Sequence, residues 1–146
     1  MKILTSTYED ILTYAQQTPD RETGAVLGGR NGIVTMFVAD PGKASSAFHY
    51  VPDIERINDA ITSWFDEGIE FMGLLHTHLW ERSLLSEGDR KYITQIMRAN
   101  EETQGLVLYF PIITLPNTTM IAYRAGNVKA GQVTIERETV EYVDSI

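Results

Sequence analysis

The segment Phe71–His78 reads FMGLLHTH and decides the fold that the sequence predicts. It is apolar almost throughout, and only its last residues are polar. A nearly continuous apolar run of this kind is typical of a strand that is buried on both faces of a sheet. Such a strand requires helices packed on the sheet, so the segment predicts an α/β domain.

A helix is predicted on each side of this strand in the sequence. The earlier helix starts at Asp53 and stops at Gly68, because glycine commonly ends helices. The later helix opens at Ser86, after a loop over 79–85. Their apolar stripes recur at helical spacing. The stripes comprise Ile54, Ile57, Ile61, Trp64 and Phe65 in the first helix, and Tyr92, Ile93, Ile96 and Met97 in the second.

The rest of the chain completes a mixed sheet. Another helix is predicted from Thr7 to the pair Pro19-Asp20, and Asn31-Gly32 is a tight-turn dipeptide between two strands. The order α-β-β-α-β-α-β-β-β predicts a single domain over residues 1–146, of α/β class with helices packed on a mixed sheet. The remaining strands are predicted over 22–29, 33–38, 105–110, 120–123 and 132–135, and residues 49–51 are compatible with a strand extension.

The composition excludes several classes of function. The 146 residues include 12 Lys and Arg and 20 Asp and Glu, so the formal net charge is −8. We expect no nucleic-acid partner and no anionic membrane surface, because both require clustered basic residues. The chain has no cysteine, so thiolate nucleophiles, cysteine metal ligands and disulfides are excluded as well.

We expect the protein to be cytoplasmic. No segment approaches the roughly 18 apolar residues that span a bilayer. The start of the chain, MKILTSTYED, lacks the basic and apolar regions of a secretory signal.

Two histidines end the apolar strand. Strand side chains alternate between faces, so His76 and His78 project from the same face. Two neutral imidazoles on one face begin a metal site, and Asp89, in the first turn of the next helix, is the natural third ligand. A catalytic zinc ion keeps a fourth position for water and lowers the pKa of that water to about 7. The sequence therefore predicts a hydrolytic metal site.

Two further residues are candidates for the chemistry. Glu22, on an early strand, can take a proton from water and give it to a leaving nitrogen. Ser86 can hydrogen-bond the oxyanion of a tetrahedral intermediate. Both also have simpler interpretations. Ser86 and Asp89 fit an ordinary capping arrangement, which is compatible with the metal site because it would present Asp89. Glu22, taken alone, would be a solvated acid at the edge of a strand.

These residues resemble the JAMM motif, which marks the metal-dependent branch of the MPN/Mov34/JAB superfamily. The pattern is His-x-His, seven residues, Ser, two residues and Asp, with an upstream Glu in the segment ETGAVLGG. The resemblance implies a zinc metallopeptidase on a cytidine-deaminase-like α/β/α sandwich. It also implies that His76, His78 and Asp89 hold the zinc ion. Glu22 would then be the general acid and base, and Ser86 would stabilise the oxyanion.

The resemblance also implies a class of substrate. Family members hydrolyse bonds after the C-terminal glycine of ubiquitin or ubiquitin-like proteins, and small bacterial members are linked to sulfur-carrier proteins. We therefore expect a ubiquitin-like or sulfur-carrier-like protein as the partner. Many members have Pro where this chain has Leu79, so we expect the following loop to take another path, which bears on the substrate preference more than on the zinc site. In that loop Trp80, Leu84 and Leu85 are either ordinary packing or a lip that holds a substrate tail.

Three alternatives stay open at this point. They are a non-catalytic MPN scaffold, a phage-tail-assembly type of JAB peptidase, and another metal hydrolase on a related sandwich, such as a deaminase. Zinc deaminases use a Pro-Cys-x-x-Cys ligand pair, which a chain without cysteine lacks. Scaffolding modules typically lose the metal ligands, whereas this sequence retains the whole set.

Overall fold

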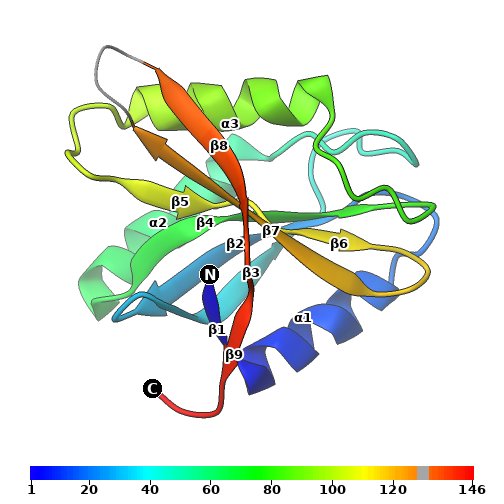
Figure 1. The fold of residues 1–146 in the computed structure, drawn as a ribbon, viewed down its shortest axis with the longest axis horizontal. Helices are drawn as coiled ribbons and strands as arrows, with labels where there is room; N and C mark the ends of the chain where they lie inside the picture. The colour runs from blue at the N-terminus through cyan, green and yellow to red at the C-terminus, as the bar shows by residue number, and fades with distance from the viewer. Residues whose placement is uncertain (128–131) are drawn as a thin grey trace.

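The computed structural model describes residues 1–127 and 132–146. These residues form a nine-stranded sheet and three helices (Figure 1). The helices are α1 (Thr5–Gln16), α2 (Ile54–Glu67) and α3 (Glu87–Ala99). The strands are β1 (Lys2–Leu4), β2 (Gly24–Arg30), β3 (Ile33–Asp40), β4 (Glu70–His78), β5 (Val107–Tyr109), β6 (Ile112–Thr114), β7 (Thr119–Asn127), β8 (Val133–Glu138) and β9 (Glu141–Val143).

The sheet is mixed, and β4 lies in its interior. The strand order is β5-β7-β6-β4-β2-β3-β1-β9, with β8 paired to β7. β2 is antiparallel to both β3 and β4, whereas β4 is parallel to β5 and β6. At the other end, β1 is parallel to β3 and β9. The apolar segment of the sequence is therefore a central strand of the sheet.

Helices cover both faces of the sheet. Leu75 packs with Ile11 of α1 in one core, whereas Leu74 packs with Trp64 of α2 and Ile93 of α3 in the other. These two leucines serve opposite cores because successive side chains of a strand point to opposite faces. Figure 1 shows α1 and α3 on opposite sides of the sheet. The predicted α/β/α sandwich with a mixed sheet is confirmed.

Both helices next to β4 in the sequence have the predicted ends. The Asp53 side chain caps the start of α2, and Gly68 ends this helix with a φ of 68°. Ser86 opens α3 in a capping box with Asp89. A capping box satisfies backbone N–H groups that have no partner inside the helix. Local chemistry therefore positions the first turn of α3, where a functional residue is predicted.

The predictions are wrong mainly at short strands. The sequence does not predict β1 or β9. The strand expected over 105–110 is shortened to β5, the next strand, β6, is not predicted, and residues 49–51 form no strand. The first helix begins at Thr5, directly after β1, and not at Thr7. A three-residue strand is too short to show a hydrophobic period, so pairing with strands distant in sequence specifies it.

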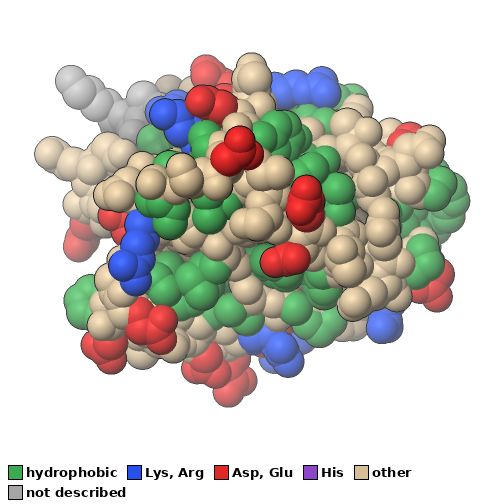
Figure 2. Space-filling view, turned by 90° about the horizontal axis from the view of Figure 1, so that it is seen from below, with side chains coloured by type: hydrophobic (Ala, Val, Ile, Leu, Met, Phe, Trp, Pro, Cys, Tyr) green, Lys and Arg blue, Asp and Glu red, His purple; other side chains and the backbone are tan. Residues whose placement is uncertain are grey.

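The surface reflects the acidic balance of the sequence. On the face shown in Figure 2, the described Lys and Arg side chains stand apart from one another among acidic and hydrophobic ones. Grouped basic side chains, which phosphate binding requires, are absent from this view of the described residues. Within residues 1–127 and 132–146, no helix is both long and apolar enough to cross a membrane.

Candidate metal centre

The C-terminal end of β4 places two imidazoles side by side. His76 and His78 are buried, and their Nε2 atoms are 2.9 Å apart. Between them, Thr77 accepts a hydrogen bond at 2.9 Å through its Oγ1 from the backbone N–H of Thr23. The alternation of the strand therefore directs the two histidines to one face, and the intervening threonine tethers the segment that leads into β2.

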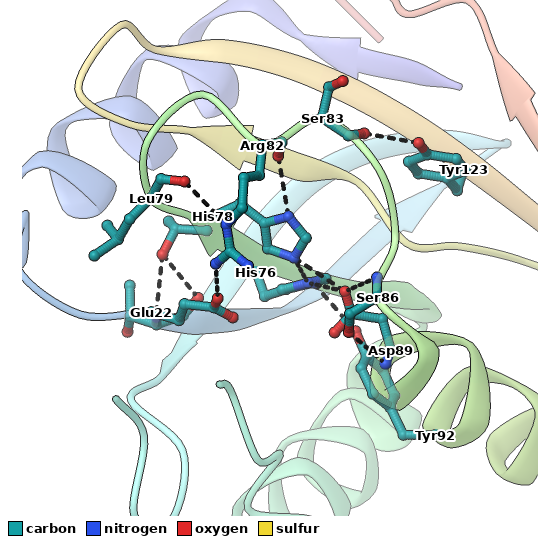
Figure 3. Close-up of polar contacts among 12 residues, drawn as sticks. Glu22, His76, His78, Leu79, Arg82, Ser83, Ser86, Asp89, Tyr92 and Tyr123 are labelled. Atoms are coloured by element: carbon teal, nitrogen blue, oxygen red, sulfur yellow. Dashed lines mark hydrogen bonds and ion pairs between the residues drawn. The ribbon is translucent and has the colours of Figure 1, made fainter. Parts of the chain in front are cut away.

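The start of α3 brings a carboxylate to the same point (Figure 3). Asp89 Oδ2 lies 3.2 Å from His76 Nε2 and 3.0 Å from His78 Nε2. The same oxygen accepts the backbone N–H of Ser86 at 2.9 Å, and the Ser86 Oγ accepts the backbone N–H of Asp89 at 3.0 Å. Burial alone would raise the pKa of Asp89, but its contacts with the two imidazoles and with the backbone N–H of Ser86 hold this pKa well below its usual range. Asp89 therefore takes part in the helix cap and also occupies the position predicted for the third metal ligand.

The chemistry of these three donor atoms fits a zinc ion. The Nδ1 of His78 lies 3.0 Å from the carbonyl oxygen of Arg82, which can only accept, so this nitrogen carries the proton. With the proton on Nδ1, the Nε2 lone pair of His78 is the one that can bind a metal ion. Burial lowers the pKa of His76, which favours the neutral form of this ring. Ligands of a tetrahedral zinc ion lie about 3.3 Å apart, close to the separations of these donors.

Glu22 lies beside this cluster. The sequence predicts Glu22 on a strand, but the residue lies just before β2, which begins at Gly24. Its side chain is buried, and one carboxylate oxygen lies within 4.8 Å of a ring nitrogen of both His76 and His78. Burial raises its pKa to about 7, although His78 and Arg82 act in the opposite direction. The structure therefore brings together Glu22, His76, His78 and Asp89, with Ser86 exposed at the start of α3.

Two tyrosines support His76, and the sequence analysis did not assign them to the site. The Tyr92 hydroxyl lies 3.2 Å from Nδ1 of His76. The Tyr50 ring stacks on the His76 ring at 5.7 Å between centroids and donates its hydroxyl to Asp40. Spacing gives a usable signal for Tyr92, because residues at i and i+3, here Asp89 and Tyr92, share a helix face. No local pattern indicates Tyr50.

The loop after β4 adds a third residue that the sequence did not indicate. The Nη2 atom of Arg82 donates to Glu22 Oε2 at 2.8 Å, and the guanidinium lies 5.6 Å from the centre of the Phe48 ring. Of the residues considered for a lip, Trp80 and Leu84 are exposed, whereas Leu85 is buried in the core. Leu85 is therefore packing.

Comparisons with known proteins support the fold. No known family model matches the chain, and no curated protein matches it either. The solution structure of a Desulfitobacterium hafniense protein is 18% identical with a TM-score of 0.68, and the match covers 99% of this chain and 94% of that one. The crystal structure of a JAB1/MPN domain protein from Archaeoglobus fulgidus is 20% identical with a TM-score of 0.56, covering 98% and 99% of the two chains. The chain therefore has the JAB1/MPN fold, with a possible metal-binding group at the end of its central strand.

Proposed function

We propose that the protein is a zinc-dependent metallopeptidase that hydrolyses an amide bond with an activated water molecule. The observation that carries this proposal is the convergence of three donor atoms, from His76, His78 and Asp89, at separations of 2.9 to 3.2 Å. The buried carboxylate of Glu22 lies next to the two imidazoles. Catalytic zinc sites keep three protein ligands and an open position for water, and a neighbouring carboxylate can accept the proton of that water.

Each residue of the chain has a distinct part in this proposal. His76, His78 and Asp89 hold the zinc ion, which when bound supplies a Lewis acid and lowers the pKa of water. Glu22 takes a proton from the attacking water as the bond between oxygen and the carbonyl carbon forms. It then delivers this proton to the leaving nitrogen as the C–N bond breaks.

Ser86 completes the proposed machinery. Its Oγ accepts the backbone N–H of Asp89 and keeps its own hydroxyl proton available for donation. The Ser86 side chain is exposed, next to the buried carboxylate of Asp89. We assign this hydroxyl the role of a donor to the oxyanion that forms on the substrate carbonyl.

The proposed substrate is a ubiquitin-like or sulfur-carrier-like protein, cleaved after its C-terminal glycine in the cytoplasm. The likeness of the site residues to the JAMM motif supports this choice, and the JAB1/MPN fold is compatible with it. Glycine has no side chain, so a tail that ends in glycine needs little room to approach the buried donor atoms.

A cleavage panel tests the function. Ubiquitin-like and sulfur-carrier-like proteins are fused through their C-terminal glycine to a reporter and incubated with the zinc-loaded protein. We expect cleavage at that glycine, and a loss of at least about 100-fold in Glu22→Gln with zinc stoichiometry unchanged. The matched control is Glu101→Gln, which alters an exposed carboxylate beyond α3 and is expected to keep full activity.

Two results would contradict the proposal. One is full activity of Glu22→Gln on the cleaved substrate, which removes the proton-transfer role. The other is stoichiometric zinc binding without cleavage of any fusion, which favours a non-catalytic scaffold.

A further inference from the structure

The turn that follows the two histidines has an unusual backbone. Trp80 and Glu81 have φ values of 55° and 59°, and the Arg82 backbone N–H donates to the Leu79 carbonyl at 3.4 Å. Positive φ at both central residues is the pattern of a type I′ turn, which glycine and asparagine normally supply. Residues with side chains tolerate this backbone only where their surroundings hold them there.

The surroundings of the turn are well defined. The backbone N–H of Glu81 donates to the Leu115 carbonyl at 3.0 Å, and its carboxylate accepts the backbone N–H of Asn117 at 2.7 Å. On the other side, the Trp80 ring lies 4.8 Å from the Phe48 ring. The loop between β6 and β7 and the loop after β3 therefore clamp the turn from two directions.

This turn presents Arg82 to two residues of the candidate site at once. Its carbonyl oxygen lies 3.0 Å from the Nδ1 of His78, and its guanidinium binds Glu22. The guanidinium is also tied to its own turn, because Nε donates to the Leu79 carbonyl at 3.2 Å. Figure 3 shows the Arg82 side chain extending from the loop to the carboxylate.

The carboxylate of Glu22, which Arg82 binds, can either coordinate a metal ion or transfer a proton. Glu22 lies close enough to both imidazoles to join them as a metal ligand. A carboxylate that coordinates the ion fills the position that a catalytic site keeps for water, and such a site becomes structural. The bond from Arg82 occupies Oε2 and directs it toward the loop, so the second oxygen is left for a proton.

We propose that Arg82 is a positioning residue that holds Glu22 outside the metal coordination sphere, so that Glu22 transfers protons and does not become a fourth ligand. This inference rests on the proposed function, since it assumes a metal on His76, His78 and Asp89. It goes beyond the motif, because Arg82 lies between the motif positions and contacts them only in the folded chain.

Cobalt substitution tests the inference without a substrate. Co²⁺ alone is titrated into Arg82→Ala, Arg82→Lys, Arg82→Ala combined with Glu22→Gln, and the control Arg98→Ala, an exposed arginine of α3. We expect the visible absorption of Arg82→Ala to differ from wild type, because the released Glu22 enters the coordination sphere. The double variant returns to the wild-type spectrum, and Arg98→Ala never departs from it. Arg82→Lys keeps the positive charge, so its spectrum lies between those of the wild type and Arg82→Ala.

Kinetics supply a second readout once a cleaved fusion is in hand. We expect kcat of Arg82→Ala to fall about 10- to 100-fold with KM unchanged, the range typical for residues that orient catalytic groups. Arg82→Lys recovers part of this loss, which a residue needed only for folding would not show.

The outcomes separate the two proposals. A wild-type cobalt spectrum in Arg82→Ala overturns the positioning role, whether or not the protein cleaves any fusion. A changed spectrum that Glu22→Gln does not reverse overturns it as well. Failure of the cleavage panel together with the expected spectra would contradict the peptidase function and leave the positioning role supported.

Discussion

The hydroxyl of Tyr92 lies 3.2 Å from Nδ1 of His76, on the ring nitrogen opposite the one that faces Asp89. Asp89 and Tyr92 both lie on α3, about one helical turn apart, so a single helix contacts the two nitrogens of the His76 ring. A partner on the outer nitrogen fixes the orientation of a histidine ligand and tunes its basicity.

Removal of that hydroxyl should weaken metal binding. We expect Tyr92→Phe to reduce zinc affinity about 10- to 100-fold, because the His76 ring loses the group that orients it. Competition with a chelating dye measures the affinity. Tyr109→Phe, on β5, is the control and should bind zinc as wild type does. Equal affinity in both variants would show that stacking by Tyr50 suffices to hold the ring.

Zinc should stabilise the folded protein through the same residues. A ligand at 100 times its Kd adds about 2.7 kcal/mol to the free energy of unfolding, which for a chain of this size raises Tm by about 5–10 °C. We expect this shift on adding zinc and its reversal by a chelator, both read by thermal unfolding. Asp89→Asn should abolish most of the shift. A shift that survives in Asp89→Asn would place the ion elsewhere.

Ser86 combines a helix cap with a proposed catalytic role, and two substitutions separate them. Ser86→Ala should lower the free energy of unfolding by about 1 kcal/mol through loss of the cap, and should also lower kcat. Ser86→Asp keeps a capping oxygen but offers no hydroxyl proton, so we expect Tm to recover while kcat stays low. Recovery of both in Ser86→Asp would reduce Ser86 to a cap.

Gly24 has a steric role that reaches the metal centre. A Cβ on Gly24 would lie 2.3 Å from Cζ of Tyr50, the ring that stacks on His76. We expect Gly24→Ala to cost about 1–3 kcal/mol of stability and to weaken zinc binding, because the Tyr50 ring must move.

Gly88 is the matched control for this substitution. The nearest atom to a Cβ there is 3.7 Å away, so Gly88→Ala should stay within about 1 kcal/mol of wild type. Thermal unfolding and zinc titration compare the two variants. Similar zinc affinities in both would exclude a link from Gly24 through Tyr50 to the site.

The features that the sequence predicts correctly are those that depend on interactions between residues close together in the chain. The ends of α2 and α3 depend on Asp53, Gly68 and Ser86, whose effects act within a few residues, so the pattern predicts them. The convergence of His76 and His78 follows from strand alternation for the same reason. The three-residue strands β1 and β9 pair with each other across almost the whole length of the chain, and no local pattern reveals them.

Reading the chain alone, one obtains the apolar central strand, the helices that must cover it, and the spacing that places two imidazoles and a capped aspartate near one another. Those features come from periodicity and capping, which are local. The folded molecule adds the approach of Glu22 to the histidines and the hold of Arg82 on Glu22, across a separation of 60 residues. Such contacts arise because β2 pairs with β4 and because neighbouring loops contact the turn after His78. The local sequence around Glu22 and Arg82 predicts neither constraint.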